Sequence, residues 1–116
     1  MKLVYASRKG NVQKLIDRLD VEALKIVDGT ETIDGDYVLV TYTDGQGILP
    51  PAVETFINAH KEGLKAAAVS GNEERHPDTF CAAADILAEQ YGTEILARFN
   101  GDGDESVDAA IKAALA

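Results

Sequence analysis

Residues 7–11 combine the side chains that a phosphate-binding turn needs. The stretch reads Ser-Arg-Lys-Gly-Asn and joins an apolar run ending at Ala6 to a helical pattern beginning at Val12. A hydroxyl, two cations and an amide can donate hydrogen bonds to an anion, and glycine lets the backbone approach it closely. The first N–H groups of the helix would add donors at the positive end of its dipole. We therefore predict an anion site here, although ordinary turns are built from the same residues.

The charge distribution supports this prediction more than the spacing does. The turn has neither the G-x-x-x-x-G-K-[ST] spacing of a Walker loop nor the G-x-G-x-x-G of a dinucleotide-binding turn. Residues 1–18, however, hold five cations against one acid, a local charge of +4 in a chain of net charge −9. The rest of the chain therefore carries a net charge of −13, which opposes binding to a nucleic-acid backbone and favours a basic partner. The alternative to an anion site is that this uneven charge distribution belongs to an ordinary solvated surface.

Two further loops carry small and polar residues after apolar runs. Residues 41–51 read TYTDGQGILPP, and residues 69–78 read VSGNEERHPD. Gly45 and Gly47 either form an ordinary turn or let the main chain lie against a flat ligand and change conformation at low cost. The second loop opens with Ser-Gly-Asn at 70–72, before a charged tail.

Apolar runs of strand length alternate with helical patterns along the chain. The strand-like runs are Leu3–Ala6, Ala23–Val27, Tyr37–Tyr42, Leu64–Val69 and Glu94–Phe99. The middle runs are almost continuously apolar, which is typical of parallel strands covered on both faces. This alternation predicts an α/β three-layer sandwich with a five-stranded parallel sheet.

Four helical patterns separate or follow these runs. Asn11 is the expected N-cap of the first helix and Asp104 of the fourth. Pro51 opens the second helix, whereas the third follows Pro77 and ends at Gly92. The helical spacing predicts these buried positions: Val12, Leu15, Ile16, Leu19, Val53, Phe56, Ile57, Phe80, Ala84, Leu87, Tyr91, Val107, Ile111 and Leu115.

The connection between the second and third strands is unusually short. Asp28–Asp36 alone joins them, which is too little for the helix that normally crosses between parallel strands. We therefore expect a reduced fold in which one face of the sheet is thinly covered. In doubly wound sheets, ligands bind outside the carboxyl ends of the strands, and Ser7–Asn11, Thr43–Pro50 and Ser70–Pro77 all fall there.

Length and composition predict one domain over residues 1–116. No apolar run is long enough to span a membrane, and the N-terminus lacks a signal-peptide pattern. One cysteine, Cys81, cannot form an internal disulfide, which fits a cytoplasmic location. It lies on the expected third helix and is better interpreted as a packed side chain than as a nucleophile.

The sequence holds no recognisable catalytic or metal-binding set. A Ser-His-Asp triad needs a histidine held by a carboxylate; the histidines are His60, late on an expected surface helix, and His76. No cluster has metal-ligand spacing. Any chemistry is therefore expected to come from a cofactor.

Three stretches together resemble the NrdI family, the small flavodoxin-like proteins that serve class Ib ribonucleotide reductase. They are SRKGNVQKLI, VLVTYTDGQGILPPAVETFI and AAVSGN, and the likeness extends through ADILAEQYGTEILARF and the short second crossover. The combination of these motifs at these distances is quite specific. The resemblance implies a flavodoxin-like sheet with strand order 2-1-3-4-5.

The resemblance also implies FMN as the cofactor. Its phosphate is expected on Ser7, Arg8, Lys9, Gly10, Asn11 and Val12. Its isoalloxazine ring is expected between two loops. The first consists of Thr43, Asp44, Gly45, Gln46 and Gly47, and the second of Ser70, Gly71 and Asn72 with the residues just after them, including His76.

The implied function is redox chemistry for a metal-radical enzyme. The reduced flavin of such proteins reacts with oxygen, and the superoxide is supplied to the dimanganese, NrdF-type small subunit of the reductase, where it drives assembly of the tyrosyl radical. The implied partners are this subunit and a flavin-reducing protein, without nucleic acid or membrane. The protein would be an accessory flavoprotein rather than a stand-alone enzyme.

Two segments depart from the family pattern. Family members usually place a flavin-stacking aromatic residue shortly after SGN, but this chain reads EERHPDTF, with His76 the nearest candidate and Phe80 further along. After the last strand, the family's FE…GT pattern is replaced by FNGDGD. With no tryptophan in the chain and no tyrosine expected nearby, the ring would be open to oxygen, and cations such as Lys9 or Arg75 would stabilise superoxide as it forms.

Two other functions stay open. An electron-transfer flavodoxin would dock its acidic surface on basic reductases, but such proteins usually shield the flavin with aromatic residues, and this chain has few. A cofactor-free, receiver-like module would need an acidic cluster after the first strand, where this chain reads YASRKG.

Overall fold

The computed structural model describes residues 1–44 and 47–116 and shows a five-stranded parallel sheet. The strand order is β2-β1-β3-β4-β5, and each neighbouring pair is parallel. The predicted sheet and its order are therefore confirmed. The strands are β1 (Lys2–Tyr5), β2 (Ala23–Lys25), β3 (Tyr37–Tyr42), β4 (Leu64–Gly71) and β5 (Glu94–Asn100).

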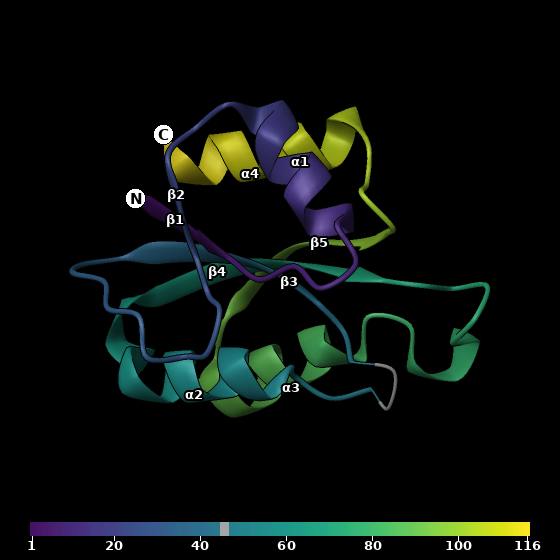
Figure 1. The fold of residues 1–116 in the computed structure, drawn as a ribbon, viewed down its shortest axis with the longest axis horizontal. Helices are drawn as coiled ribbons and strands as arrows, with labels where there is room; N and C mark the ends of the chain where they lie inside the picture. The colour runs from purple at the N-terminus through teal and green to yellow at the C-terminus, as the bar shows by residue number, and fades with distance from the viewer. Residues whose placement is uncertain (45–46) are drawn as a thin grey trace.

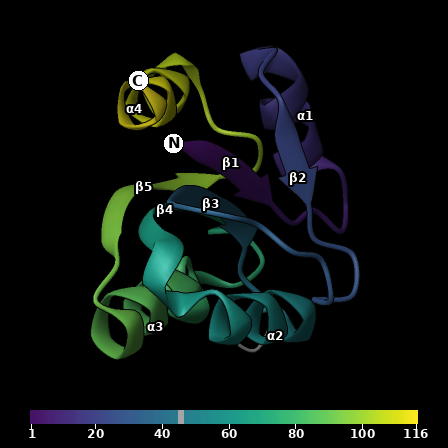
Figure 2. The ribbon, with the colours of Figure 1, turned by 90° about the vertical axis from the view of Figure 1, so that its left-hand side faces the viewer.

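Two pairs of helices cover the two faces of the sheet (Figures 1 and 2). α1 (Asn11–Leu19) and α4 (Glu105–Leu115) lie on one face, and α2 (Pro51–Ala59) and α3 (Ala82–Tyr91) lie on the other. Each face has its own hydrophobic core, because the nearly continuous apolar strands present side chains to both sides. The site described below lies at the carboxyl edge of this sheet.

Most of the predicted buried positions are buried. Phe80, Tyr91 and Leu115 are the exceptions, since each is only partly covered. Tyr91 keeps its hydroxyl at the surface, where it donates a hydrogen bond to Asn58 Oδ1 at 2.8 Å. Tyr91 and Leu115 end their helices, and amphipathic spacing does not tell how deeply the last turn of a helix is covered; Phe80 lies before α3 begins.

The first helix begins differently from the prediction. Gly10 rather than Asn11 is the N-cap, with a left-handed φ of 94°, and Asn11 is the first helical residue. This conformation suits glycine because a Cβ is disfavoured there. The capping oxygen comes from further back: Ser7 Oγ accepts a hydrogen bond from the Gln13 N–H at 3.2 Å. By contrast, Asp104 caps α4 as predicted, accepting from the N–H groups of Ser106 and Val107.

The third helix also begins later than Pro77 suggests. Pro77–Thr79 forms a separate short 3-10 helix, and α3 begins at Ala82 after a break. Phe80 is not helical, with φ of −54° and ψ of 118°, and Cys81 is left-handed, with φ of 54°. Proline correctly marks a helical start here, but the chain turns once more before it enters α3.

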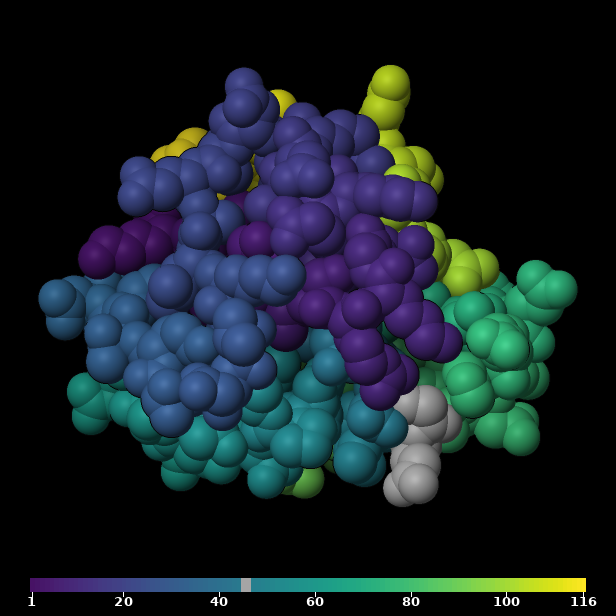
Figure 3. All heavy atoms as spheres, viewed as in Figure 1, coloured from purple at the N-terminus to yellow at the C-terminus, as the bar shows by residue number. Residues whose placement is uncertain are grey.

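A loop takes the place of the missing crossover helix. Residues 26–36, all of them described, contain no helix, and the loop lies against α2 (Figure 3). β2 ends at Lys25, earlier than predicted, because the N–H groups of Val27 and Asp28 turn to the Glu31 carboxylate instead of a strand. The loop places Ile33 against the core, so a loop rather than a helix covers this part of the face.

The strands β4 and β5 extend further than predicted, to Gly71 and Asn100. These two residues are paired across the sheet, and the Gly101 N–H donates to the Gly71 carbonyl oxygen at 3.1 Å. The extra pairing holds the β5–α4 loop beside the end of β4. In residues 1–44 and 47–116, the structure has no helix of the length and apolar character needed to cross a membrane.

Candidate functional site

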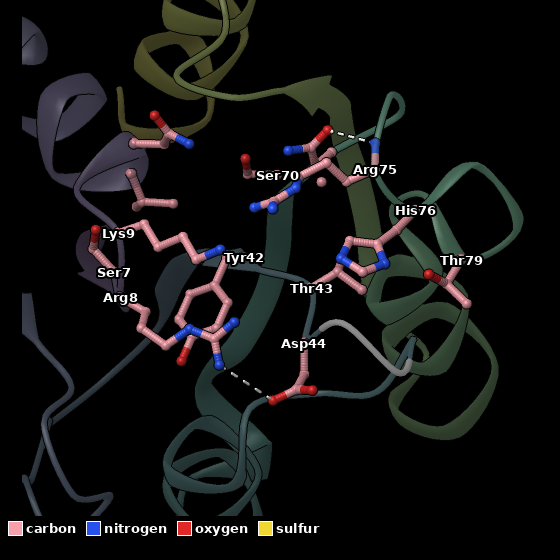
Figure 4. A pocket seen from close by; sticks show the side chains of 14 residues that line it. Ser7, Arg8, Lys9, Tyr42, Thr43, Asp44, Ser70, Arg75, His76 and Thr79 are labelled. Atoms are coloured by element: carbon pink, nitrogen blue, oxygen red, sulfur yellow. Dashed lines mark hydrogen bonds and ion pairs between the residues drawn. The ribbon is translucent and has the colours of Figure 1, made fainter.

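The predicted loops meet in one pocket at the carboxyl ends of β1, β3 and β4. Its cavity volume is about 90 Å³, and the space opens to solvent. The β1–α1 turn forms one side, and the segment after β4 forms the other (Figure 4). The predicted site residues that line this pocket are Ser7, Arg8, Lys9, Asn11, Val12, Thr43, Asp44, Ser70, Gly71, Asn72 and His76.

The β1–α1 turn presents hydrogen-bond donors to this pocket. The first four N–H groups of a helix have no partner within the helix. In α1, the Gln13 N–H donates to Ser7 Oγ and the Lys14 N–H to the Gly10 carbonyl. Within residues 1–44 and 47–116, the N–H groups of Asn11 and Val12 have no such partner and can donate to a ligand. The first helical turn reads Asn-Val-Gln and is uncharged, so no carboxylate there repels an anion. Local geometry therefore suits a phosphate.

Thr43 supplies an independent sign of a polar ligand. Its Oγ1 atom is buried and has no hydrogen-bond partner among the described residues, although the residue lines the pocket. Its N–H is used, since it donates to the Ser70 carbonyl at 2.9 Å. A buried hydroxyl without a partner costs free energy of about 1–3 kcal/mol, which a hydrogen bond from a ligand would recover.

Tyr42, Arg8 and Asp44 form a contact group at the pocket. The Arg8 guanidinium carbon lies 5.3 Å from the centre of the Tyr42 ring, and Arg8 Nη1 lies 3.8 Å from Asp44 Oδ2. Burial raises the pKa of the Tyr42 hydroxyl; the Arg8 charge opposes this rise, and the Asp44 charge adds to it. The expectation that no tyrosine lies near the site is therefore wrong, since Tyr42 lines the pocket.

Ser70 and Asn72 use their side chains to build the pocket itself. The buried Ser70 hydroxyl donates to the Gly101 carbonyl oxygen at 2.5 Å. Asn72 Oδ1 accepts from the Arg75 N–H at 3.0 Å and so closes the turn after β4. These contacts assign both side chains a structural task that the motif SGN does not reveal.

The segment after β4 places His76 at the pocket but Phe80 away from it. His76 is exposed, and its N–H donates to the Asn72 carbonyl oxygen at 2.8 Å. Phe80 packs against the hydrophobic core instead. Cys81, directly after it, is fully buried, and burial raises the pKa of its thiol to about 11. The interpretation of Cys81 as a packed side chain is confirmed.

Two predicted positions among the described residues, Gly10 and Gly47, do not line the pocket. Gly10 shapes the turn without lining the pocket, and Gly47 lies beside Thr79 and Ala82. Gly45 and Gln46 lie outside the described residues. The lining also includes three residues outside the predicted binding set: Tyr42, Arg75 and Thr79. From the sequence, Arg75 is expected only as a cation near the flavin. Tyr42 could have been identified as a lining residue because it is the last residue of a buried strand.

The sequence is similar to one family of known proteins over most of its length. The model of the NrdI flavodoxin-like family matches residues 3–112. Protein NrdI of Ruegeria sp. is 34% identical over 119 residues, covering 97% of this chain and 85% of that protein. The SPbeta prophage-derived protein NrdI of Bacillus subtilis is 35% identical over 105 residues, covering 87% and 80%.

Solved structures show the same fold at lower sequence identity. The crystal structure of Fusobacterium nucleatum flavodoxin bound to flavin mononucleotide has a TM-score of 0.68 and 13% identity, over 98% of this chain and 95% of that one. A flavodoxin mutant from Pseudomonas aeruginosa has a TM-score of 0.53 and 21% identity, over 97% and 99%. Because the family match spans nearly the whole sequence, the chain belongs to the NrdI family of flavodoxin-like proteins.

Proposed function

We propose that this protein binds FMN in the pocket and acts as an accessory redox protein for a ribonucleotide reductase. The observation that carries the proposal is one pocket lined by both a phosphate-type turn and the buried, unpartnered Thr43 hydroxyl. Its family membership and the flavodoxin fold support the same cofactor, since the Fusobacterium nucleatum flavodoxin of similar fold is bound to flavin mononucleotide.

The phosphate would be held by the β1–α1 turn. Ser7 Oγ already accepts from Gln13, so its own proton is available to donate to a phosphate oxygen. The N–H groups of Asn11 and Val12 add donors at the helix end, while Arg8 and Lys9 add positive charge. A ligand without a phosphate would leave these donors unused.

The flavin ring would lie between the loop after β3 and the end of β4. Thr43 Oγ1 offers it a buried polar contact, and Gly71 lines the pocket at the end of β4. A bound and reduced FMN would provide the one-electron reduction of oxygen to superoxide. Lys9 and Arg75 line the same pocket, and their charge favours an anion that forms there.

The superoxide would be supplied to the dimanganese, NrdF-type small subunit of a class Ib ribonucleotide reductase. The net charge of −9, with its excess of acids outside residues 1–18, would keep the anion from spreading over the rest of the surface. A flavin-reducing protein would supply the electrons, and both partners would be cytoplasmic.

An electron-transfer flavodoxin is the second candidate, and Tyr42 favours it. This tyrosine lines the pocket, where an aromatic ring could shield a flavin from oxygen. The two candidates predict different acceptors for the same electrons, and this difference can be measured.

The test mixes the anaerobically reduced holoprotein with oxygen and a manganese-loaded class Ib small subunit, and then measures the tyrosyl radical by EPR. We expect a radical signal with the holoprotein and none with the apoprotein. If no radical forms but the reduced protein passes electrons rapidly to a cytochrome without oxygen, the protein is an electron-transfer flavodoxin rather than an activator of the reductase. A protein that does not bind FMN would exclude both.

A further inference from the structure

Arg8 joins the two sides of the pocket. It belongs to the β1–α1 turn, yet its guanidinium lies over Tyr42, at the end of β3, and 3.8 Å from the carboxylate of Asp44 (Figure 4). All three residues line the pocket together with Ser7 and Asn11. One side chain from the phosphate side therefore covers an aromatic ring on the flavin side.

Both interactions of Arg8 are weak enough to exchange. The Arg8 side chain is 53% exposed and that of Asp44 is 26% exposed, and ion pairs at such positions contribute little to stability. The cation–π interaction of Arg8 with the partly buried Tyr42 ring is also modest. A phosphate offers a guanidinium a stronger partner, because it carries more charge and can accept two parallel hydrogen bonds.

We infer that Arg8 is a positioning residue that couples the two halves of this pocket, an inference that rests on the proposed FMN site. Without an anion in the turn, Arg8 lies over Tyr42 and beside Asp44. With an anion bound, Arg8 turns to it and uncovers the Tyr42 ring for a flat ligand. Each half of the ligand must displace the same side chain, so whichever binds first removes that cost for the other. The two halves should therefore bind with positive cooperativity.

The apoprotein allows the two halves to be added separately, as inorganic phosphate and riboflavin. Riboflavin affinity is measured from the quenching of its fluorescence at increasing phosphate and constant ionic strength. For the wild-type protein, we expect saturating phosphate to tighten riboflavin binding on the order of fivefold, because the cation–π interaction that Arg8 must give up is modest. By linkage, riboflavin should tighten phosphate binding by the same factor.

Three variants separate Arg8 from the general charge of the pocket. Arg8→Met keeps a long stem but can make neither the ion pair nor the cation–π interaction, so riboflavin binding should become independent of phosphate. Tyr42→Leu removes the aromatic ring and should lower both riboflavin affinity and the coupling. Lys14→Met is the matched control, because it removes the same charge from an exposed position of α1 outside the pocket. It should keep the full coupling, and circular dichroism checks that each variant is folded.

The experiment distinguishes failure of this inference from failure of the proposed FMN-binding function. Coupling that disappears in Arg8→Met but persists in Lys14→Met supports the inference. Equal coupling in the wild type and Arg8→Met overturns it, as does a wild-type protein whose riboflavin affinity ignores phosphate while FMN still binds. If neither riboflavin nor FMN binds the wild type, the proposed function fails together with the inference.

Discussion

Gly71 and Cys81 meet where β4 ends and the chain enters α3, and a Cβ added to Gly71 would lie 2.8 Å from the Cys81 nitrogen and 3.1 Å from its Sγ. Backbone this close cannot be displaced by rotating a side chain. The pocket edge at Gly71 is therefore fixed by contact with Cys81, the residue directly before α3.

Gly71→Ala should destabilise the protein by about 1–3 kcal/mol, because the new methyl group pushes the Cys81 backbone away from β4. The measurement is the free energy of unfolding in urea. Adding Cys81→Ala should restore little of it, since that change relieves the sulfur contact but not the contact with the nitrogen. If Gly71→Ala is as stable as the wild type, the close approach of Gly71 and Cys81 does not contribute to stability.

Asn11→Asp should weaken FMN binding at least tenfold. A carboxylate beside the phosphate introduces a repulsion larger than the roughly 1.4 kcal/mol that a factor of ten requires. The fold should not suffer, because Asn11 is exposed and an acid in the first helical turn is favourable. Asn11→Ala, which adds no charge, is the control and should lose less affinity. Unchanged FMN affinity in Asn11→Asp would place the phosphate elsewhere.

Glu31→Gln should reduce stability by about 1 kcal/mol at pH 7. Burial would raise the pKa of Glu31, but hydrogen bonds from the N–H groups of Val27, Asp28 and Gly29 outweigh it and hold the pKa below its usual 4.5. A lowered folded-state pKa stabilises the fold above pH 4.5, and this stabilisation is lost as the pH falls through the folded value.

The difference in stability between the wild type and Glu31→Gln should therefore disappear in acid, where the carboxyl is protonated in both folded and unfolded chains. Urea unfolding from pH 7 to pH 3 measures it. Glu22→Gln, at an exposed position, removes the same charge and serves as the control. A difference between wild type and Glu31→Gln that persists unchanged at low pH would assign the effect to packing rather than to the carboxylate.

Cys81 should resist iodoacetamide in the folded protein. Its thiol is fully buried and has a pKa of about 11, so little thiolate forms at pH 8 and little reagent reaches it. Mass spectrometry should find labelling only after denaturation in urea. Fast labelling of the native protein would mean that the start of α3 opens readily.

The regular elements were predictable because their signals are local. Continuous apolar strands and amphipathic helices give the three layers directly, as with Leu15 of α1 and Phe56 of α2, both fully buried. The short Asp28–Asp36 connection likewise predicted the absence of a crossover helix. The strand order, in contrast, came from resemblance to a family rather than from the physical pattern.

The details of the pocket depend on contacts between distant residues. Gly10 replaces Asn11 as the cap because Ser7 supplies the capping oxygen from outside the helix. Tyr42 was missed because a residue in an apolar strand is expected in the core, whereas at the last position of β3 it borders the pocket. The spacing of residues along the chain does not reveal these contacts between distant residues.

Ser70 connects three parts of the chain beneath the pocket. Its carbonyl oxygen accepts from the Thr43 N–H, and its hydroxyl donates to Gly101, so the loops after β3 and β5 are both tied to β4. A ligand entering the pocket would meet a floor whose hydrogen bonds are already formed. The conformational entropy lost on binding is then confined to exposed side chains at the rim, such as Arg8 and Arg75, and affinity depends mainly on how freely these move beforehand.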